Sequence, residues 1–434
     1  MGRRRGASLW HGCIFLLLCF WCPQLSAAAD RGTVVVDHRV FPGLHEMDGH
    51  WSSLMEASDG KVYVGLALHG GDGHLVYYDP ESDLMTDVGN LTRLVGETLQ
   101  RQGPQSKIHT RFGEGADGRI YFGTHAGFWW DYARFGTKEG YSGGHWMAFD
   151  PASGQVEDLG LAIAHDGIVT GAYDPVHHRL YGISYPRAHF IYHDVAGRRS
   201  VDKGRINNFD SVCRTLGVDD RGRVYGSFGR GQIFRYDPQS DALTELSLQL
   251  PIREKGISLG RDYQKSESAW RVVVWHPDRK VFYGVEESAS ILFSFDPNQE
   301  GAGAVRRLRQ ISQAGFQDRR DVPYATLSLS TGPGGLLYYG AAGKEFDYSG
   351  STGPAASNLI TYDLEKGEMQ DRGALTLRDG RRVLGTNAAH SGPSGNVYLV
   401  GAIEVKPEPE EPLKSGGKIG ETPFRLALLI YRPE

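Results

Sequence analysis

Two histidines, His125 and His145, flank a stretch of the chain that is rich in aromatic and basic residues. The stretch reads GTHAGFWWDYARFGTKEGYSGGHWMAFD from residue 123 to 150, and it contains Trp129 and Trp130. Imidazole exchanges protons near neutral pH, and indole offers a large flat apolar face on which a sugar ring can lie. The spacing therefore predicts a long loop that carries acid–base groups beside an aromatic wall.

Further polar and aromatic residues recur just ahead of strand-like runs, and Tyr185 and Arg187 follow one such run. The chain shows no HExxH, P-loop, GxSxG or paired CxxC motif and no convincing pair of carboxylates for glycoside hydrolysis. A set of His, Tyr and Arg suits β-elimination on a uronic acid, in which a cation neutralises the carboxylate and a Tyr or His moves the proton. The recurring residues are Trp51, His109, Thr170, Arg214, Arg271, Tyr324 and Asn387.

These residues are positioned by a repeat that occurs seven times. One unit reads as a turn, a basic residue, an aliphatic residue, an aromatic residue and then glycine, as in DGKVYVG and DGRIYFG. A second unit, such as HLVYYDPES or HWMAFDPAS, alternates like a strand and ends in a turn. The aromatic positions of the first unit are Tyr63, Tyr121, Tyr181, Tyr225, Phe282, Tyr338 and Tyr398.

The repeat predicts an all-β fold, a seven-bladed β-propeller with four antiparallel strands per blade. We expect residues 33–41 to complete the sheet of the C-terminal strand and close the ring. The turns between first and second strands are short, whereas the loops between second and third strands vary widely in length. Long loops on a rigid scaffold usually carry function, so the site is expected on that edge.

One regularity argues against a chemical role for some histidines. His74, His145 and His189 each begin the third strand of a repeat. A residue that recurs at one repeat position is more typical of architecture than of chemistry. For His74 we favour a structural role, and for His145 and His189 both roles stay open. His125 does not follow this recurrence.

The N-terminus predicts export. Residues 1–29 contain three arginines, an apolar run and a small-residue cleavage site, which together indicate a secretory signal peptide. The remaining residues, 30–434, are predicted to form one domain with Cys213 as the only cysteine. Removing three arginines and no acid changes the formal charge from -5 to -8. We therefore expect a secreted or periplasmic protein that binds neither nucleic acid nor, after cleavage, a membrane.

The segments DGRIYFGTHAG, GGHWMAFD, LYGISYPRAHF and CRTLGVDDRGRVYG resemble the secreted seven-bladed propeller polysaccharide lyases, ulvan lyases in particular. The resemblance covers most of the mature chain as a blade pattern and is specific from about residue 109 to 214. It implies that Tyr185 is the general base and acid, that Arg214 neutralises the uronate, and that His125 and His145 assist. Arg187 and Arg205 remain alternatives to Arg214 as the cation that neutralises the uronate. His109 remains an alternative to one of the two histidines.

Two other functional classes stay open. One is a non-catalytic propeller that binds a glycan or a protein, and the other is a metal-dependent propeller enzyme of the oligogalacturonate lyase or lactonase type. We expect no required cofactor, although a structural metal ion is an alternative. The expected partner is an anionic polysaccharide, and the expected state is a monomer. His109, Arg187, Arg271, Tyr324, Asn387, Trp129 and Trp130 are expected to contact this substrate.

Overall fold

The structure is a computed structural model of the chain. It describes residues 32–98, 103–127, 140–207, 213–228, 231–251, 269–287, 289–311, 325–342, 356–405, 417–419 and 422–433. The expected signal peptide lies outside these ranges. Residues Gly32–Glu434 form one compact unit. In the described part of the chain, no helix has the length and apolarity that a membrane span would need.

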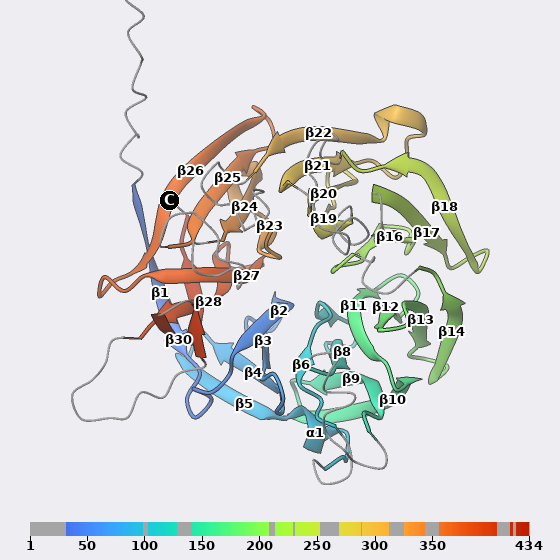
Figure 1. The fold of residues 1–434 in the computed structure, drawn as a ribbon, viewed down its shortest axis with the longest axis horizontal. Helices are drawn as coiled ribbons and strands as arrows, with labels where there is room; N and C mark the ends of the chain where they lie inside the picture. The colour runs from blue at the N-terminus through green and yellow to red at the C-terminus, as the bar shows by residue number, and fades with distance from the viewer. Residues whose placement is uncertain are drawn as a thin grey trace, which may run out of the picture. The chain divides into compact units, whose positions relative to one another are not determined.

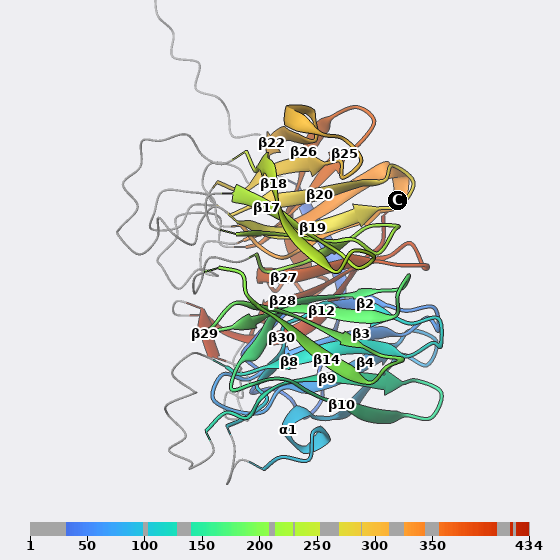
Figure 2. The same cartoon turned by 90° about the vertical axis from the view of Figure 1, so that its right-hand side faces the viewer.

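Within residues 32–434, small antiparallel sheets are arranged in a ring, with their first strands toward the centre and their last strands at the rim (Figure 1). The prediction of an all-β propeller is confirmed. Figure 2 shows the same sheets from the side of the ring. The first three sheets are β2 (Gly49–Glu56), β3 (Val62–Ala67), β4 (His74–Asp79) and β5 (Leu84–Asn90); β6 (Lys107–Ile108), β7 (Gly113–Glu114), β8 (Ile120–His125), β9 (Gly143–Asp150) and β10 (Gln155–Ala164); and β11 (Gly167–Asp174), β12 (Arg179–Tyr185), β13 (His189–Asp194) and β14 (Arg199–Arg205).

Two more four-stranded sheets follow along the chain, and short helices join or extend some strands. The sheets are β15 (Gly217–Val218), β16 (Val224–Phe228), β17 (Gln232–Asp237) and β18 (Ala242–Gln249); and β19 (Trp270–His276), β20 (Val281–Glu286), β21 (Ile291–Phe295) and β22 (Val305–Gln310). The helices are α1 (Leu91–Leu94), whose N-cap is Asn90, and the 3₁₀ turns η3 (Gly301–Gly303) and η4 (Pro333–Gly335).

The remaining strands form a single nine-stranded sheet. Its members are β23 (Leu329–Gly332), β24 (Leu336–Ala341), β25 (Asn358–Asp363), β26 (Glu368–Leu377), β27 (Val383–Ser391), β28 (Val397–Glu404), β29 (Gly417–Ile419), β30 (Thr422–Tyr431) and β1 (Thr33–Val40). Strand β1 pairs in parallel with β26 through residues 33–36 and antiparallel with β30 through residues 37–40.

This pairing departs from the predicted seven separate sheets. The described strands form six hydrogen-bonded sheets, five of which have the four or five strands of a single blade. The sixth is larger because β1 links the group β23–β26 to the group β27, β28 and β30 along its two edges. The N-terminal strand therefore joins two groups of strands instead of completing one isolated sheet.

The repeat aromatics form the core that holds the sheets together. All seven lie on second strands, and their exposed fractions are 3% or less. The glycine that follows each of them in the repeat leaves room for an adjacent strand or for the neighbouring sheet. A Cβ at these glycines would lie between 2.1 Å (Gly340) and 2.9 Å (Gly182 and Gly401) from another atom. The repeat glycines are thus required by packing, because an alanine at any of them would overlap with an adjacent atom.

Candidate functional site

The first strands of the sheets bulge at the edge of the ring where the second strands end. In β19, for example, Trp270 pairs with Glu286 and Val272 with Val285, which leaves Arg271 as an extra residue. A bulge leaves one residue outside the ladder and redirects its side chain. Extra residues at these positions in six such strands, or in the segments that lead into them, are Trp51, His109, Val169, Arg214, Arg271 and Asn387.

Five of these six residues are the ones that counting back from the repeat aromatics predicts. In the third sheet, however, the sequence predicts Thr170, and the structure places Val169 at the equivalent position. The difference arises because a bulge adds residues to one strand only, so counting along the chain can miss by one. Thr170 is fully buried.

Five aromatic rings from three neighbouring sheets form a continuous chain along this edge. The ring of Trp51 lies between those of His69 and His109, at centroid distances of 5.2 Å and 5.1 Å. His109 meets His125 at 5.6 Å, and His125 meets Tyr185 at 5.6 Å, both edge to face. This row of rings therefore brings the predicted His125 and Tyr185 into contact and places His109 beside them.

Positive charge surrounds the two central histidines of this chain. His109 and His125 are each 4% exposed. Burial lowers the pKa of both well below the usual histidine value, and the charges of Lys107 and Arg214 lower it further. Arg271 has the same effect on His109. Both imidazoles are consequently neutral at pH 7, and they stand beside cations that can attract an anion.

Lys107 belongs to this site, although the sequence analysis does not single it out. It is 4% exposed, and its Nζ lies 4.0 Å from the centroid of the Trp51 ring, a cation–π contact. It pairs across the ladder with His125. Its place two residues before His109, on a strand that pairs with the strand of His125, is a signal that could have identified it.

The imidazole of His125 packs against the backbone of Gly167. A Cβ at Gly167 would lie 1.8 Å from His125 Nδ1, so any other residue would push the ring away. Within the described ranges, the buried Nδ1 atoms of His125 and His109 have no hydrogen-bond partner. Buried polar atoms in folded proteins usually have a partner, so these two atoms favour a site that binds something.

His145 does not join this chain of rings. Its Nδ1 lies 3.0 Å from both oxygens of Asp158, and its Nε2 lies 3.6 Å from Glu97 Oε1. Burial alone would lower the pKa of His145, but the hydrogen bonds to Asp158 and Glu97 outweigh burial and raise the pKa to about 9. His145 is therefore a protonated link between third and fourth strands, and the geometry favours the structural interpretation over the expected catalytic one.

The same link recurs in three other sheets. His74 contacts Asp87, and His189 contacts Asp202 with the same Nδ1 atom and the same separation of thirteen residues along the chain. In the nine-stranded sheet an asparagine takes this position, and Asn358 Nδ2 donates to Asp371 at 3.0 Å. The recurrence supports a structural role for the histidines that begin β4, β9 and β13.

Arg187, expected to contact substrate, is held by a buried carboxylate. Its Nε lies 2.8 Å from Asp166 Oδ1, and its guanidinium also donates to the carbonyl of Ala164. Ser184 Oγ donates to the other oxygen of Asp166 at 2.7 Å. The charge of Arg187, near Tyr185, is therefore already balanced by Asp166. The charge of Arg214, in contrast, lowers the pKa of His109 and His125.

Arg271 and Asn387 are also engaged within the protein. Arg271 Nη1 lies 3.4 Å from Glu287 Oε1. Asn387 Oδ1 accepts from Leu327 N, and its Nδ2 donates to the carbonyl of His50. The arrangement of Asn387 links three first strands and leaves its amide little capacity for a ligand. Arg271 keeps its place close to His109.

Three expected substrate contacts, Trp129, Trp130 and Tyr324, lie outside the described residues. Arg205 lies in the rim strand β14 and donates to the carbonyl of Asn207, away from the row of aromatic rings. In the part of the chain that the structure describes, no group of three His, Cys, Asp or Glu side chains is placed to hold a metal ion. Cys213 is buried, and burial raises the pKa of its thiol to about 12.

Comparison with known proteins identifies the fold and nothing finer. No family model and no curated protein matches the chain. Among solved structures, virginiamycin B lyase from Staphylococcus aureus is similar with a TM-score of 0.56 and 8% identity over 92% of this chain and 99% of that one. The WD40 repeats of RRP9 are similar with a TM-score of 0.55 and 14% identity over 91% of this chain and 98% of that one. A fungal alcohol oxidase of the AA5 family in complex with copper is similar with a TM-score of 0.54 and 11% identity over 93% of this chain and 77% of that one.

These neighbours share the propeller and differ in what their names describe. Identities of this size establish the fold alone, and a propeller hosts many unrelated functions. The resemblance noted in the sequence therefore stays an expectation. The function has to be argued from the residues at the edge of the ring.

Proposed function

We propose that this protein is a lyase that cleaves an anionic, uronate-containing polysaccharide by β-elimination. The observation that carries the proposal is the contact of His125 with Tyr185 at an edge that is rich in cations. The described part of that edge contains Lys107, Arg214 and Arg271. Its carboxylates are engaged by neighbours: Asp48 contacts His69, Asp166 holds Arg187, and Glu287 pairs with Arg271. An edge of this kind suits an anionic sugar better than hydrolysis by two separated carboxylates.

The reaction breaks two bonds and forms one double bond. A base removes the proton from C5 of the uronate, negative charge spreads onto its carboxylate, and the C4–O4 bond then breaks. The electron pair of the C5–H bond becomes the C4=C5 double bond, and O4 leaves with a proton. No oxidant or cofactor is needed, since electrons only move within the substrate.

Each role falls to a residue whose chemistry suits it. Tyr185 is proposed as the group that removes the C5 proton and protonates O4. Arg214 is proposed to neutralise the carboxylate, because its planar guanidinium matches the two oxygens. His125, neutral and in contact with Tyr185, hydrogen-bonds the substrate or the phenol, and His109 supports it. His145 is left out of this set.

The test is the ultraviolet absorbance of the unsaturated uronate that elimination creates. The protein is mixed with ulvan, glucuronan, pectate, alginate and glycosaminoglycans, each with and without a chelator. We expect absorbance to rise on one polymer, and Tyr185→Phe to lower kcat by about 10²–10⁴-fold, the usual contribution of acid–base catalysis. His189→Asn, which alters a structural link at the rim, is the matched control and should keep its activity.

Three outcomes would count against the proposal. A flat trace on every polymer, together with glycan binding, would favour a non-catalytic binding propeller. Activity that a chelator removes and a metal ion restores would favour a metal-dependent enzyme. Full activity in Tyr185→Phe would remove that residue from the mechanism.

We also propose the finer architecture that the repeat predicts. The nine-stranded sheet counts as two blades, β23–β26 and β27, β28, β30 and β1, which gives a seven-bladed ring closed by β1. Its support is that the groups on either side of β1 each have their own repeat aromatic, Tyr338 and Tyr398. Residues 30–434 would then be one domain that is exported by residues 1–29 and acts as a secreted or periplasmic monomer.

A further inference from the structure

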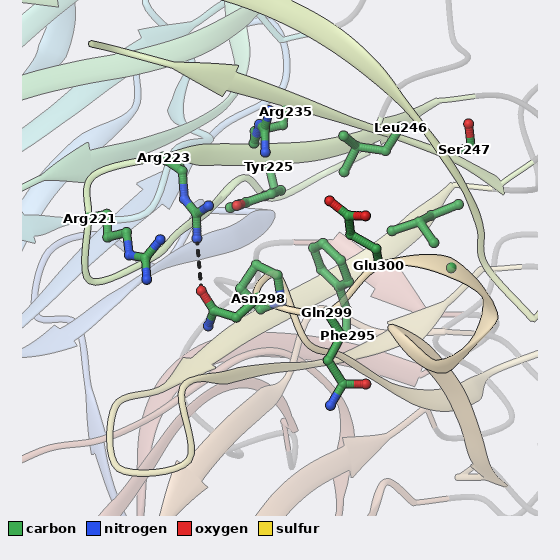
Figure 3. A pocket seen from close by; sticks show the side chains of 13 residues that line it. Arg221, Arg223, Tyr225, Arg235, Leu246, Ser247, Phe295, Asn298, Gln299 and Glu300 are labelled. Carbon is green, nitrogen blue, oxygen red and sulfur yellow. Dashed lines mark hydrogen bonds between the residues drawn. The ribbon is translucent and has the colours of Figure 1, made fainter.

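A cavity lies between the sheets β15–β18 and β19–β22, at the end of the strands opposite the candidate site. Its volume is about 540 Å³, within the range of small-ligand sites. It is formed by the turn that leads into β16, the rim strand β18 and the turn that follows β21 (Figure 3). Its lining residues include Arg221, Arg223, Arg235, Asn298 and Glu300.

The three arginines of this cavity differ in whether a carboxylate neutralises their charge. Arg223 is held by Asp219, whose Oδ2 lies 2.7 Å from its Nε, and it also donates to Asn298 Oδ1 at 3.2 Å. Within the described ranges, neither Arg221 nor Arg235 forms an ion pair, and the buried Nε of Arg235 has no hydrogen-bond partner. The cavity therefore holds more guanidinium charge than its one lining carboxylate, Glu300, can balance.

The rest of the lining is apolar and aromatic. Tyr225, Phe295, Leu246 and Leu248 form surfaces of the cavity beside the guanidinium groups. Tyr225 is 1% exposed and its hydroxyl donates to Asp219 at 3.3 Å, so its ring is fixed in place. Arg235 pairs across the ladder with Tyr225, which puts an unbalanced cation next to this ring. A ligand that fits would combine an acidic group with a ring-sized carbon body.

We propose that this cavity binds an organic oxyanion, a carboxylate or sulfate ester on a sugar-sized ring, with Arg235 and Arg221 as its cation contacts. Arginine suits such oxyanions because its N–H groups match two oxygens at once. The buried Nε of Arg235 would gain the partner that it lacks within the protein. The site is separate from the reaction proposed above, because it lies at the other end of the strands, and it holds whether or not the protein is a lyase.

The experiment is a titration of the full chain with glucuronate, glucose 6-sulfate and glucose, followed by calorimetry or by protein NMR. We expect one or both acids to bind, with an affinity that falls as salt rises, and glucose to bind at least tenfold more weakly. Arg235→Gln should weaken acid binding at least tenfold. Arg306→Gln, in the exposed part of the neighbouring strand β22, is the matched control and should bind as the parent does.

The two acids distinguish the two sources of the oxyanion, a uronate and a sulfated sugar. Unchanged binding in Arg235→Gln, equal binding of glucose and the acids, or no binding of either acid would overturn the proposal. Because Arg235→Gln could also weaken the fold, its thermal midpoint is measured beside that of Arg306→Gln, and Arg221→Gln, at an exposed position, provides a second test of the same site.

Discussion

Gly167 determines where the imidazole of His125 can lie, and through it the contact with Tyr185. We predict that Gly167→Ala lowers kcat on the identified polymer at least tenfold, because the new methyl group would overlap His125 Nδ1. The backbone of Gly167 is outside the left-handed region, so alanine adds a steric conflict and no backbone strain. The measurement compares kcat, KM and the unfolding midpoint of the variant with those of the parent.

Gly303→Ala is the matched control for that substitution. A Cβ at Gly303 would meet only Gln299 Oε1, at 3.4 Å, so this change should leave both activity and stability near the parent values. If Gly167→Ala keeps full activity, the position of His125 does not matter to the reaction. A loss of stability with no separate loss in kcat would assign Gly167 to packing alone.

The neutral state of His125 and His109 has a consequence for ligand binding. Burial is the largest cause of their lowered pKa, and Lys107 and Arg214 add to it. A bound carboxylate would offset those cations and raise the pKa of His125 toward its usual value. Substrate would thus make His125 a better proton acceptor than it is in the empty site.

At the scale of secondary structure, a histidine or asparagine repeatedly ties the third strand of a sheet to the fourth. In each case the aspartate partner lies two residues before a glycine with positive φ, as Asp158 does before Gly160 and Asp371 before Gly373. The aspartate accepts the backbone N–H of that glycine, so one carboxylate holds both the bulge and the neighbouring strand. The link is therefore part of how these sheets are built.

His145→Asn tests this view, because Asn358 already makes the same link in another sheet. The raised pKa of His145 means that its folded form holds a proton more tightly than its unfolded form. Its contribution to stability is present below pH 6.5 and is lost as pH rises through about 9. We predict that the parent loses up to about 3 kcal/mol of unfolding free energy relative to His145→Asn across that range.

Denaturant titrations from pH 6 to pH 10 measure this difference directly. The variant should also retain activity at pH 7, since asparagine preserves the link to Asp158. Abolished activity in a well-folded His145→Asn would restore the catalytic role that the sequence analysis leaves open. An identical pH dependence in the two proteins would show that His145 is not the group that titrates.

At the scale of the whole molecule, β1 holds together the two groups of strands that make up the nine-stranded sheet. Its residues pair with β26 on one side and β30 on the other, and Val34 and Val36 are buried. Hydrogen bonds from Arg378 and Arg432 lower the pKa of Asp37 to about 2. The strand is therefore joined to its neighbours by backbone pairing, apolar burial and exposed ion pairs.

We predict that deletion of residues 33–40 destabilises the protein far more than Asp37→Asn does. Burial of Val34 and Val36 contributes about 3–6 kcal/mol, and the deletion also exposes the edges of β26 and β30. Asp37→Asn removes only contacts to largely exposed arginines and should cost about 1 kcal/mol or less. Denaturant midpoints measure both. Equal midpoints for parent and deletion would mean that β1 does not stabilise the nine-stranded sheet.

The sequence by itself determined the repeat and therefore the fold. Tyr63, Tyr121 and their counterparts recur because each sheet must fill the same space between neighbours, and local spacing reveals that requirement. The same spacing predicted which residues lie at the start of the first strands, since a repeat places equivalent residues at equivalent positions. His109 and Arg214 were accessible in this way, and His125 and Tyr185 end second strands of the same repeat.

Only the tertiary structure decided which of these residues meet. The charge of His145 is balanced by Asp158 and Glu97, and that of Arg187 by Asp166, and none of these carboxylates stands out in the sequence. Lys107 joins the site through a ladder pair and a contact with Trp51 from the preceding sheet. Such contacts depend on neighbouring sheets and on bulges one residue long, which a pattern along one chain does not encode.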